Sequence, residues 1–315
     1  MKIRKAMCVL MLAGLLTGCA NRGPSPLETA RTAGISYMEN GDYTAAAASF
    51  EEAYQLCDDK MPQTKTDISL YEASCYLKLE NYEQTKDVCT RILGLGENAD
   101  ACYMRGTAFL HLGESEAARA DFDQSVALDA RNLQRYLNIY QQYESISQSA
   151  VGDAYLQMAL QLQSEDIEED YQKACIYYYL NDYSRAQELL SAAVEQKHAG
   201  AMLLMGQVYL AQDDSVRAYI VYQQYIEKYG ETPEAYNGLV LCEIAEGSYE
   251  KAIQTAEKGL ALVGEAGKRD LLYNQIVAYE KKLDFATAKA KAEQFMSLYP
   301  EDEQGKKEYD FLITR

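Results

Sequence analysis

Cysteine is the most reactive residue type in this chain of 315 residues, and of its eight cysteines Cys19 has the most distinctive surroundings. Before it come a basic start, with Lys2, Arg4 and Lys5, and an apolar stretch of 11 residues from 6 to 16. The stretch is too short to span a bilayer, which takes about 20 residues, and it has the proportions of a secretory signal. We therefore predict a signal peptide over residues 1–18, closed by small residues of the kind that a signal peptidase admits.

The run Leu16-Thr17-Gly18-Cys19 resembles the lipobox of bacterial lipoproteins. The resemblance implies cleavage before Cys19 and a diacylglycerol group on its sulfur; the alternative is an ordinary secretory signal with an incidental cysteine. Two acyl chains suffice for stable anchoring, since each buried methylene contributes about 0.8 kcal/mol. We expect residues 19–26 to hold the lipidated cysteine and a short tether of about 25 Å. The expected location is extracytoplasmic, on the cell membrane or, in a cell with two membranes, on the outer one.

Other groups that could do chemistry lack the settings that such chemistry needs. His111 and His198 have no companions that form a metal set, and residues 264–269 have neither the glycine spacing nor the Ser or Thr of a P-loop. The acidic run at 165–170 lacks the alternating ligands and the glycine of a calcium loop. It suits the first turn of a helix, where negative charge complements the helix dipole. The sequence thus favours a protein that is not an enzyme and holds no metal or other cofactor.

Six cysteines remain once Cys8 leaves with the signal and Cys19 carries lipid. An even number in an exported chain allows disulfides. Most of the six, however, fall on packing positions of expected helices, where cysteine behaves as a small hydrophobic residue. We expect free, buried thiols at Cys57, Cys75, Cys89, Cys102, Cys175 and Cys242.

The chain is strongly acidic, with 48 acidic and 30 basic residues and a formal net charge of −18. Residues 1–18 hold three of the basic residues and no acidic one, so the mature chain would carry −21. Such a body is repelled by anionic lipid and by a phosphate backbone. We expect no nucleic acid partner, and contact with the membrane only through the lipid on Cys19.

A small residue recurs roughly every 34 positions, and an aromatic residue often lies three positions before it. Such self-similarity is typical of a helical solenoid, in which each repeat packs only on its neighbours. The longest gap between the small residues, 39 positions, predicts a longer loop near residues 58–66. The small residues are Ala46, Thr85, Ala118, Ala154, Ala186, Ala218, Ala252 and Ala288.

The clearest unit, residues 233–266, opens with Ala235-Tyr236-Asn237-Gly238-Leu239 and continues with Gly247-Ser248-Tyr249-Glu250-Lys251-Ala252-Ile253. It resembles the tetratricopeptide repeat, a pair of antiparallel helices brought close by small residues. The resemblance covers residues 27–302 and is weak at 133–166, where only Ala154 and Met158 are assigned to motif positions. It implies an all-α fold, a right-handed superhelical solenoid of about eight helix pairs. Residues 303–315 are expected to form a capping helix, with Tyr309, Phe311 and Leu312 against the last pair.

In this repeat family the first helix of each pair lines a concave groove. The family's ligand-facing positions, carried onto this chain, give an aromatic and neutral groove without the clamp that binds a C-terminal carboxylate. Tyrosine buries a large area and keeps a hydroxyl, so it recurs at recognition surfaces, although packing is an alternative role for these residues. The groove residues predicted in this way are Tyr103, Tyr171, Tyr178, Tyr179, Asn237 and Tyr273.

The combination of a lipobox with tetratricopeptide repeats is similar to the architecture of envelope lipoproteins that serve assembly or enzyme recruitment. It implies a non-catalytic, membrane-anchored scaffold or adaptor that holds an envelope protein or peptide segment in its groove. The alternative is a ligand-capture lipoprotein that serves a transporter and binds a peptide or glycan. Proteins of that kind usually need a deep pocket, and the regular repeats leave almost no insertions to build one.

Overall fold

The computed structural model describes residues 24–262 and 267–315, and within these ranges it contains 17 α-helices and no strand. The predicted signal peptide and Cys19 lie outside the described residues. The helices form two compact units, which we call the N-terminal unit (residues 24–163) and the C-terminal unit (residues 164–315). Among the described helices, none has the length and apolar character needed to cross a membrane.

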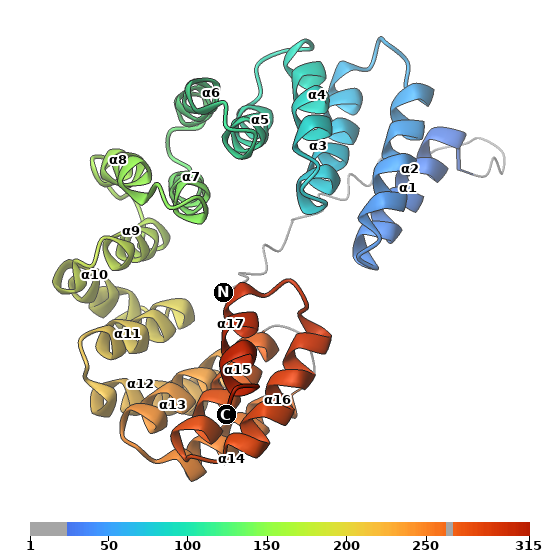
Figure 1. Ribbon diagram of the computed structural model, residues 1–315. Coiled ribbons are helices and arrows are strands. Elements are labelled where there is room, and N and C mark those ends of the chain that lie inside the picture. The colour runs from blue at the N-terminus through green and yellow to red at the C-terminus, as the bar shows by residue number, and fades with distance from the viewer. Residues whose placement is uncertain (1–23, 263–266) are drawn as a thin grey trace. The chain divides into compact units, whose positions relative to one another are not determined.

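The N-terminal unit consists of four consecutive antiparallel helix pairs, and each pair packs on the next (Figure 1). The pairs are α1 (Pro26–Glu39) with α2 (Tyr43–Leu56), α3 (Pro62–Lys78) with α4 (Tyr82–Leu93), α5 (Ala99–His111) with α6 (Ser115–Leu128), and α7 (Leu133–Ser145) with α8 (Ser149–Leu160).

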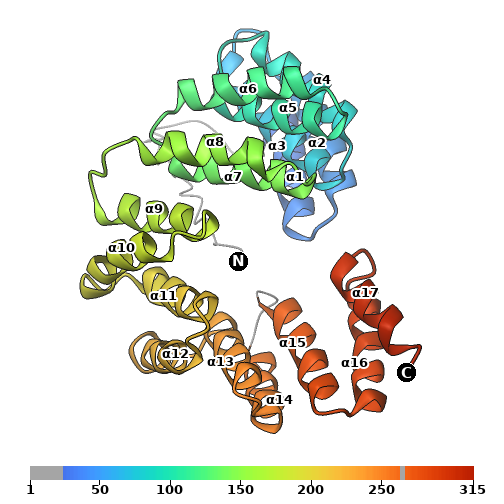
Figure 2. The same cartoon turned by 60° about the vertical axis from the view of Figure 1, so that its left-hand side comes forward.

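The C-terminal unit contains four further pairs and a last helix that packs on α16 (Figure 2). Stacked helix pairs of the tetratricopeptide type, predicted from the sequence, are thereby confirmed in both units. The elements are α9 (Ile167–Tyr179) with α10 (Tyr183–Glu195), α11 (Ala199–Ala211) with α12 (Ser215–Tyr229), α13 (Pro233–Ala245) with α14 (Tyr249–Leu260), α15 (Lys268–Lys281) with α16 (Phe285–Leu298), and finally α17 (Glu303–Leu312).

The turn inside each pair contains one residue with a positive φ, between 54° and 82°. Such a residue reverses the chain after a helix, at a small cost when it is not glycine. It occurs once per repeat and therefore fixes the register of all eight repeats. The eight residues are Gly41, Glu80, Gly113, Ser147, Asn181, Asp213, Gly247 and Leu283.

This register corrects the sequence interpretation of residues 133–166. Five positions after each turn residue lies a buried small residue, and after Ser147 it is Gly152, not Ala154. Ala154 and Met158 are exposed. A Cβ atom on Gly152 would lie 3.0 Å from Cα of Tyr140. Tyr140 stands where most of the other repeats have a small residue, and Gly152, which has no Cβ atom, leaves room for it, so the repeat is structurally regular.

The longer loop predicted near residues 58–66 is mostly helix. The loop between α2 and α3 covers only residues 57–61, and α3 has 17 residues, more than any other helix of the described chain. Pro62 occupies the first turn of α3, where its missing N–H costs nothing. The extra residues therefore lengthen α3 at its N-terminus.

The capping helix and the cysteines largely follow their predictions. Leu312 of α17 is 1% exposed and packs on the core beside α16, whereas Phe311 is 38% exposed and does not. All six described cysteines are free thiols; five are buried and Cys175 is partly exposed. Burial raises the pKa of the Cys89 and Cys242 thiols to about 12, so both are protonated and inert at neutral pH.

Candidate partner-binding surface

The first helices of consecutive pairs contact one another within each unit. In the N-terminal unit α3 contacts α5 and α5 contacts α7, and in the C-terminal unit the contacts run from α9 through α11 and α13 to α15. We call each series a first-helix row. All six residues predicted for the groove belong to these rows, so the rows are the candidate surface for a partner.

Tyr103 of α5 is partly buried and tied to the next first helix. Its ring lies 6.1 Å from that of Phe122, and its hydroxyl accepts a hydrogen bond of 3.5 Å from Nε2 of Gln142 on α7. The amide oxygen of Gln142 lies 3.2 Å from Nε2 of His111, whose ring stacks on Tyr82 at 4.5 Å. The sequence pointed to Tyr103 but missed the polar chain around it, because Gln142 is distant in sequence.

Tyr171 of α9 corrects the predicted groove, because its side chain is only 5% exposed and belongs to the core of the C-terminal unit. Its ring packs at 4.4 Å on that of His198, the N-cap of α11. His198 accepts the N–H of Ala201 at Nδ1, so Nε2 carries the proton and donates to Glu168 at 3.0 Å. His198 therefore has a structural role that joins α9 to α11, which the sequence did not predict.

Tyr178 and Tyr179 stand at the C-terminal end of α9 and are partly exposed. Their rings meet edge to face with centroids 6.0 Å apart, and Tyr178 also lies 5.9 Å from Tyr183 at the start of α10. Such a cluster offers aromatic edges at a low cost in side-chain entropy. It is a partly exposed aromatic cluster among the predicted groove residues.

Asn237 and Tyr273 extend the row in the C-terminal unit, and both have partners. The amide of Asn274 on α15 donates to Oδ1 of Asn237 on α13 at 2.8 Å. The hydroxyl of Tyr273 donates to Glu308 of α17 at 3.3 Å. Burial, together with the nearby Glu280, raises the pKa of Glu308 to about 7. The capping helix thus covers part of the row at Tyr273.

Two small cavities open on the described surface. One, of about 380 Å³, lies at the turn between α13 and α14, beside Lys251 and Lys282. The other, of about 360 Å³, lies between the N-terminal half of α3 and the loop before α5. In the described ranges no three His, Cys, Asp or Glu side chains gather in a way that could hold a metal ion.

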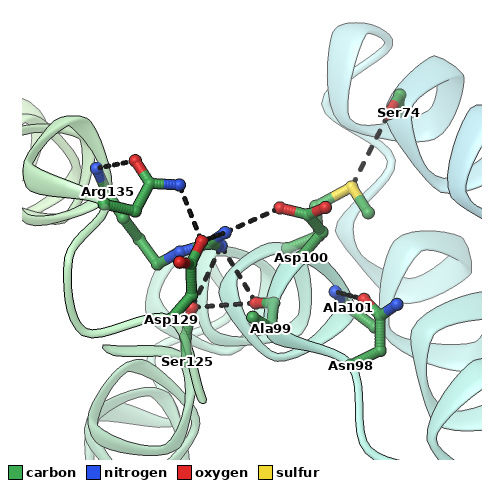
Figure 3. Close-up of polar contacts among 10 residues, drawn as sticks. Ser74, Asn98, Ala99, Asp100, Ala101, Ser125, Asp129 and Arg135 are labelled. Carbon is green, nitrogen blue, oxygen red and sulfur yellow. Dashed lines mark hydrogen bonds and ion pairs between the residues drawn. The ribbon is translucent and has the colours of Figure 1, made fainter. Parts of the chain in front are cut away.

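Arg135 joins three helices of the N-terminal unit (Figure 3). Its Nη1 donates to the carbonyl oxygen of Ala99 at 3.0 Å and to Oγ of Ser125 at 3.2 Å. Its Nη2 donates to Asp100 at 2.8 Å and to Asp129 at 3.1 Å. The side chain is 6% exposed and begins on α7, while its partners belong to α5, to α6 and to the residue after α6. This network holds the repeat at 133–166 in place.

A second, partly buried network lies between α2, α3 and α4, where Arg91 pairs with two carboxylates. Arg91 donates to Glu51 at 2.9 Å and also pairs with Glu72, which is 2% exposed. The guanidinium lies 3.8 Å from the ring centroid of Tyr54. Burial raises the pKa of Glu72 to about 7, because the attraction of Arg91 is opposed by the nearby Glu51.

The raised pKa of Glu72 makes the stability of the N-terminal unit depend on pH. Because the folded pKa lies above the ordinary 4.5, the stabilisation is fully present below about pH 4.5 and is lost as the pH rises through about 7. Between pH 5 and pH 8 we expect the free energy of unfolding to fall by about 2–3 kcal/mol more in the wild type than in Glu72→Gln. Urea unfolding at both pH values measures this difference.

Glu52→Gln is the matched control for this experiment, because Glu52 is an exposed carboxylate on the same helix as Glu51. It should retain the pH dependence of the wild type. An equal dependence in Glu72→Gln would show that Glu72 stays ionised in the folded protein.

Comparison with known proteins supports the type of repeat seen in the fold. One tetratricopeptide repeat family matches residues 171–230 and another matches residues 32–60 and 99–132, while the coatomer epsilon subunit family matches residues 207–304. The crystal structure of yeast Tom70 aligns with a TM-score of 0.66 and 16% identity, over 95% of this chain and 66% of that one. A tetratricopeptide repeat protein from Parabacteroides merdae aligns with a TM-score of 0.54 and 11% identity, over 80% of this chain and 98% of that one.

The matches show tetratricopeptide repeats at residues 32–60, 99–132 and 171–230, and the solved structures, at 11% and 16% identity, show the fold alone. Tetratricopeptide repeat proteins are in general non-catalytic scaffolds for protein interactions, and their domains bind peptide segments of partner proteins. The first-helix rows are therefore the candidate surface for binding a peptide segment of a partner protein.

Proposed function

We propose that this tetratricopeptide repeat protein is a non-catalytic adaptor of the bacterial cell envelope, anchored by a lipid on Cys19. It holds a peptide segment of an envelope protein against its first-helix rows. The observation that carries the proposal is the contact between successive first helices, from α3 to α7 in the N-terminal unit and from α9 to α15 in the C-terminal unit, which gives a partner an extended surface in each unit. The anchor is supported by the run Leu16-Thr17-Gly18-Cys19 after a signal-like segment.

The anchor is tested by changing Cys19 to serine in the full chain. The thioether to diacylglycerol needs the sulfur, so Cys19→Ser should remove palmitate labelling and move the protein out of the membrane fraction. The measurement is metabolic labelling with a palmitate analogue, followed by fractionation. Cys57→Ser, which changes a buried thiol far from the signal, is the control and should stay in the membrane. Equal labelling of wild type and Cys19→Ser would contradict the lipid anchor.

The adaptor role is tested by cross-linking the lipoprotein in its own cells and identifying partners by mass spectrometry. The double variant Tyr178→Ala with Tyr179→Ala removes the partly exposed aromatic cluster of α9 and should lower the yield of a specific protein partner by about tenfold, the equivalent of 1.4 kcal/mol. Circular dichroism of the purified variant checks that the helices remain.

Tyr219→Ala is the matched control, since Tyr219 is a partly exposed tyrosine on a second helix, α12, outside the first-helix row. It should leave the partner yield unchanged. Equal losses in both variants would count against the row as the binding surface, and the absence of any protein partner would count against the adaptor role.

A further inference from the structure

The cavity of about 360 Å³ in the N-terminal unit is an open depression between two segments of the chain. One wall is the N-terminal half of α3, and the other is the loop that joins α4 to α5. The volume is at the lower end of the range for small-ligand pockets, roughly 300–1,000 Å³, and suits one or two inserted side chains. The lining residues are Pro62, Gln63, Thr66, Asp67, Leu70, Leu95, Gly96, Glu97 and Asn98.

The lining combines an apolar wall with a rim of hydrogen-bond acceptors. Leu70 is partly buried and Leu95 is 43% exposed, so the two present aliphatic surface to anything that enters. Asp67 and Glu97 supply the charged groups of the lining, and both are carboxylates. Glu97 is exposed and makes no hydrogen bond or ion pair with any described residue, which leaves its charge available.

Asp67 already pairs with one cation, whereas Glu97, the second carboxylate, has no such partner among the described residues. Oδ2 of Asp67 accepts a hydrogen bond of 2.6 Å from Arg31 of α1, whose guanidinium also lies 5.8 Å from the ring centroid of Tyr71. Arg31 is not among the lining residues, so it does not occupy the cavity. The remaining charge at the mouth is that of Glu97, in a unit that holds 21 acidic and 10 basic residues.

The cavity lies on the first-helix row. Asp67 and Leu70 are on α3, and Leu70 occupies the repeat position that Tyr103 occupies on the neighbouring α5. The cavity exists because the extra N-terminal turn of α3, which begins at Pro62, stands beside the loop of residues 95–98. A segment bound along the row of this unit therefore has a place to insert a side chain.

We propose that this cavity binds an arginine or lysine side chain of the partner segment, which makes the partner of the N-terminal unit basic. The methylene stem lies against Leu70 and Leu95, and the cationic head reaches Glu97 and the free oxygen of Asp67. A neutral or acidic side chain would leave the Glu97 charge unpaired at a mouth that the bound segment shields from water. The inference rests on the proposed adaptor function and specifies the chemistry of its partner.

The test uses the full chain, purified in detergent, and fluorescein-labelled decapeptide libraries in which one position is fixed and the others are mixed. Fluorescence anisotropy should show that libraries with a fixed arginine or lysine bind about tenfold more tightly than those with a fixed glutamate. Glu97→Lys should reverse the order, and Leu95→Ser should weaken binding of the basic libraries without reversing it. The preference should shrink at 1 M salt.

Glu116→Lys is the matched control, because it changes the net charge equally at an exposed position on α6 outside the cavity. The basic preference should survive in this variant. A preference that Glu97→Lys leaves intact, or that Glu116→Lys removes to the same extent, would mean that overall acidity and not the cavity selects the peptide. Binding without any preference for basic peptides would likewise overturn the cavity assignment. Neither result would contradict the adaptor role if cross-linking captures a protein partner on the first-helix row of the C-terminal unit.

Discussion

Replacing Tyr222 with alanine is expected to destabilise the C-terminal unit by about 4 kcal/mol, the range for losing a large buried aromatic side chain. Tyr222 projects from α12 and is 2% exposed. Its ring fills space that two glycines leave open: a Cβ atom on Gly206 of α11 would lie 2.4 Å from the ring, and one on Gly238 of α13 would lie 2.3 Å from it. Because the ring touches two first helices, its removal leaves a cavity that neither helix can close alone.

Urea unfolding measures the loss of stability, and hydrogen exchange in α11 and α13 shows whether these two helices are the ones destabilised. Tyr222→Phe keeps the ring and should cost less than about 1.5 kcal/mol. Gly238→Ala should be destabilising as well, by about 1–3 kcal/mol, because its methyl group meets the same ring. A loss below about 1 kcal/mol in Tyr222→Ala would mean that the two first helices close over the space, and that the row is held by other contacts.

The fold could be predicted from the sequence because the signals that determine it are local. A small residue five positions after a turn lets two neighbouring helices approach, and both lie within one stretch of about 34 residues. The same reasoning failed at Gly152 because the sequence interpretation looked for the small residue alone. In that repeat Gly152 leaves room for the large Tyr140, and only their contact in three dimensions reveals this pairing.

The candidate surface was harder to predict, because exposure of a row residue depends on helices outside its own repeat. Tyr171 is covered by His198 of the following repeat, and Tyr273 is bonded to Glu308 of the capping helix. The cavity that we assign to a basic side chain depends on the lengthened α3, whereas the 39-residue gap predicted a loop there. Periodicity therefore located the first-helix rows but not the residues that remain free on them.

The repeat at 133–166 looks degenerate in sequence partly because Arg135 replaces an apolar residue. At the same repeat position five of the other repeats have fully buried apolar side chains, namely Ile68, Ala101, Ala201, Ala235 and Leu271. Arg135 makes four hydrogen bonds there, two of them to carboxylates, while its Nε is buried without a partner. A charged network thus does at α7 what hydrophobic packing does in those five repeats.

We expect Arg135→Ala to destabilise the N-terminal unit by about 3 kcal/mol, since hydrogen bonds to charged groups contribute about 1.5–3 kcal/mol each and only part of the network is lost. Asp100 and Asp129 stay partly exposed, and Asn132 still donates to Asp129, so neither carboxylate becomes a buried orphan. Arg135→Lys should recover less than half of the lost stability, because a single ammonium group cannot replace the two guanidinium nitrogens, which donate to different partners. Urea unfolding with hydrogen exchange of α7 measures these effects.

Arg119→Ala provides the comparison that separates the network from charge alone. Arg119 is 71% exposed and lies 3.9 Å from Asp123, a pair of the kind that contributes less than about 1 kcal/mol. Both variants remove one positive charge from the N-terminal unit, so equal losses would mean that Arg135 acts only through long-range attraction in an acidic protein. A loss confined to Arg135→Ala, with faster exchange in α7, would mean that the motif is weak at 133–166 because polar contacts there replace apolar ones.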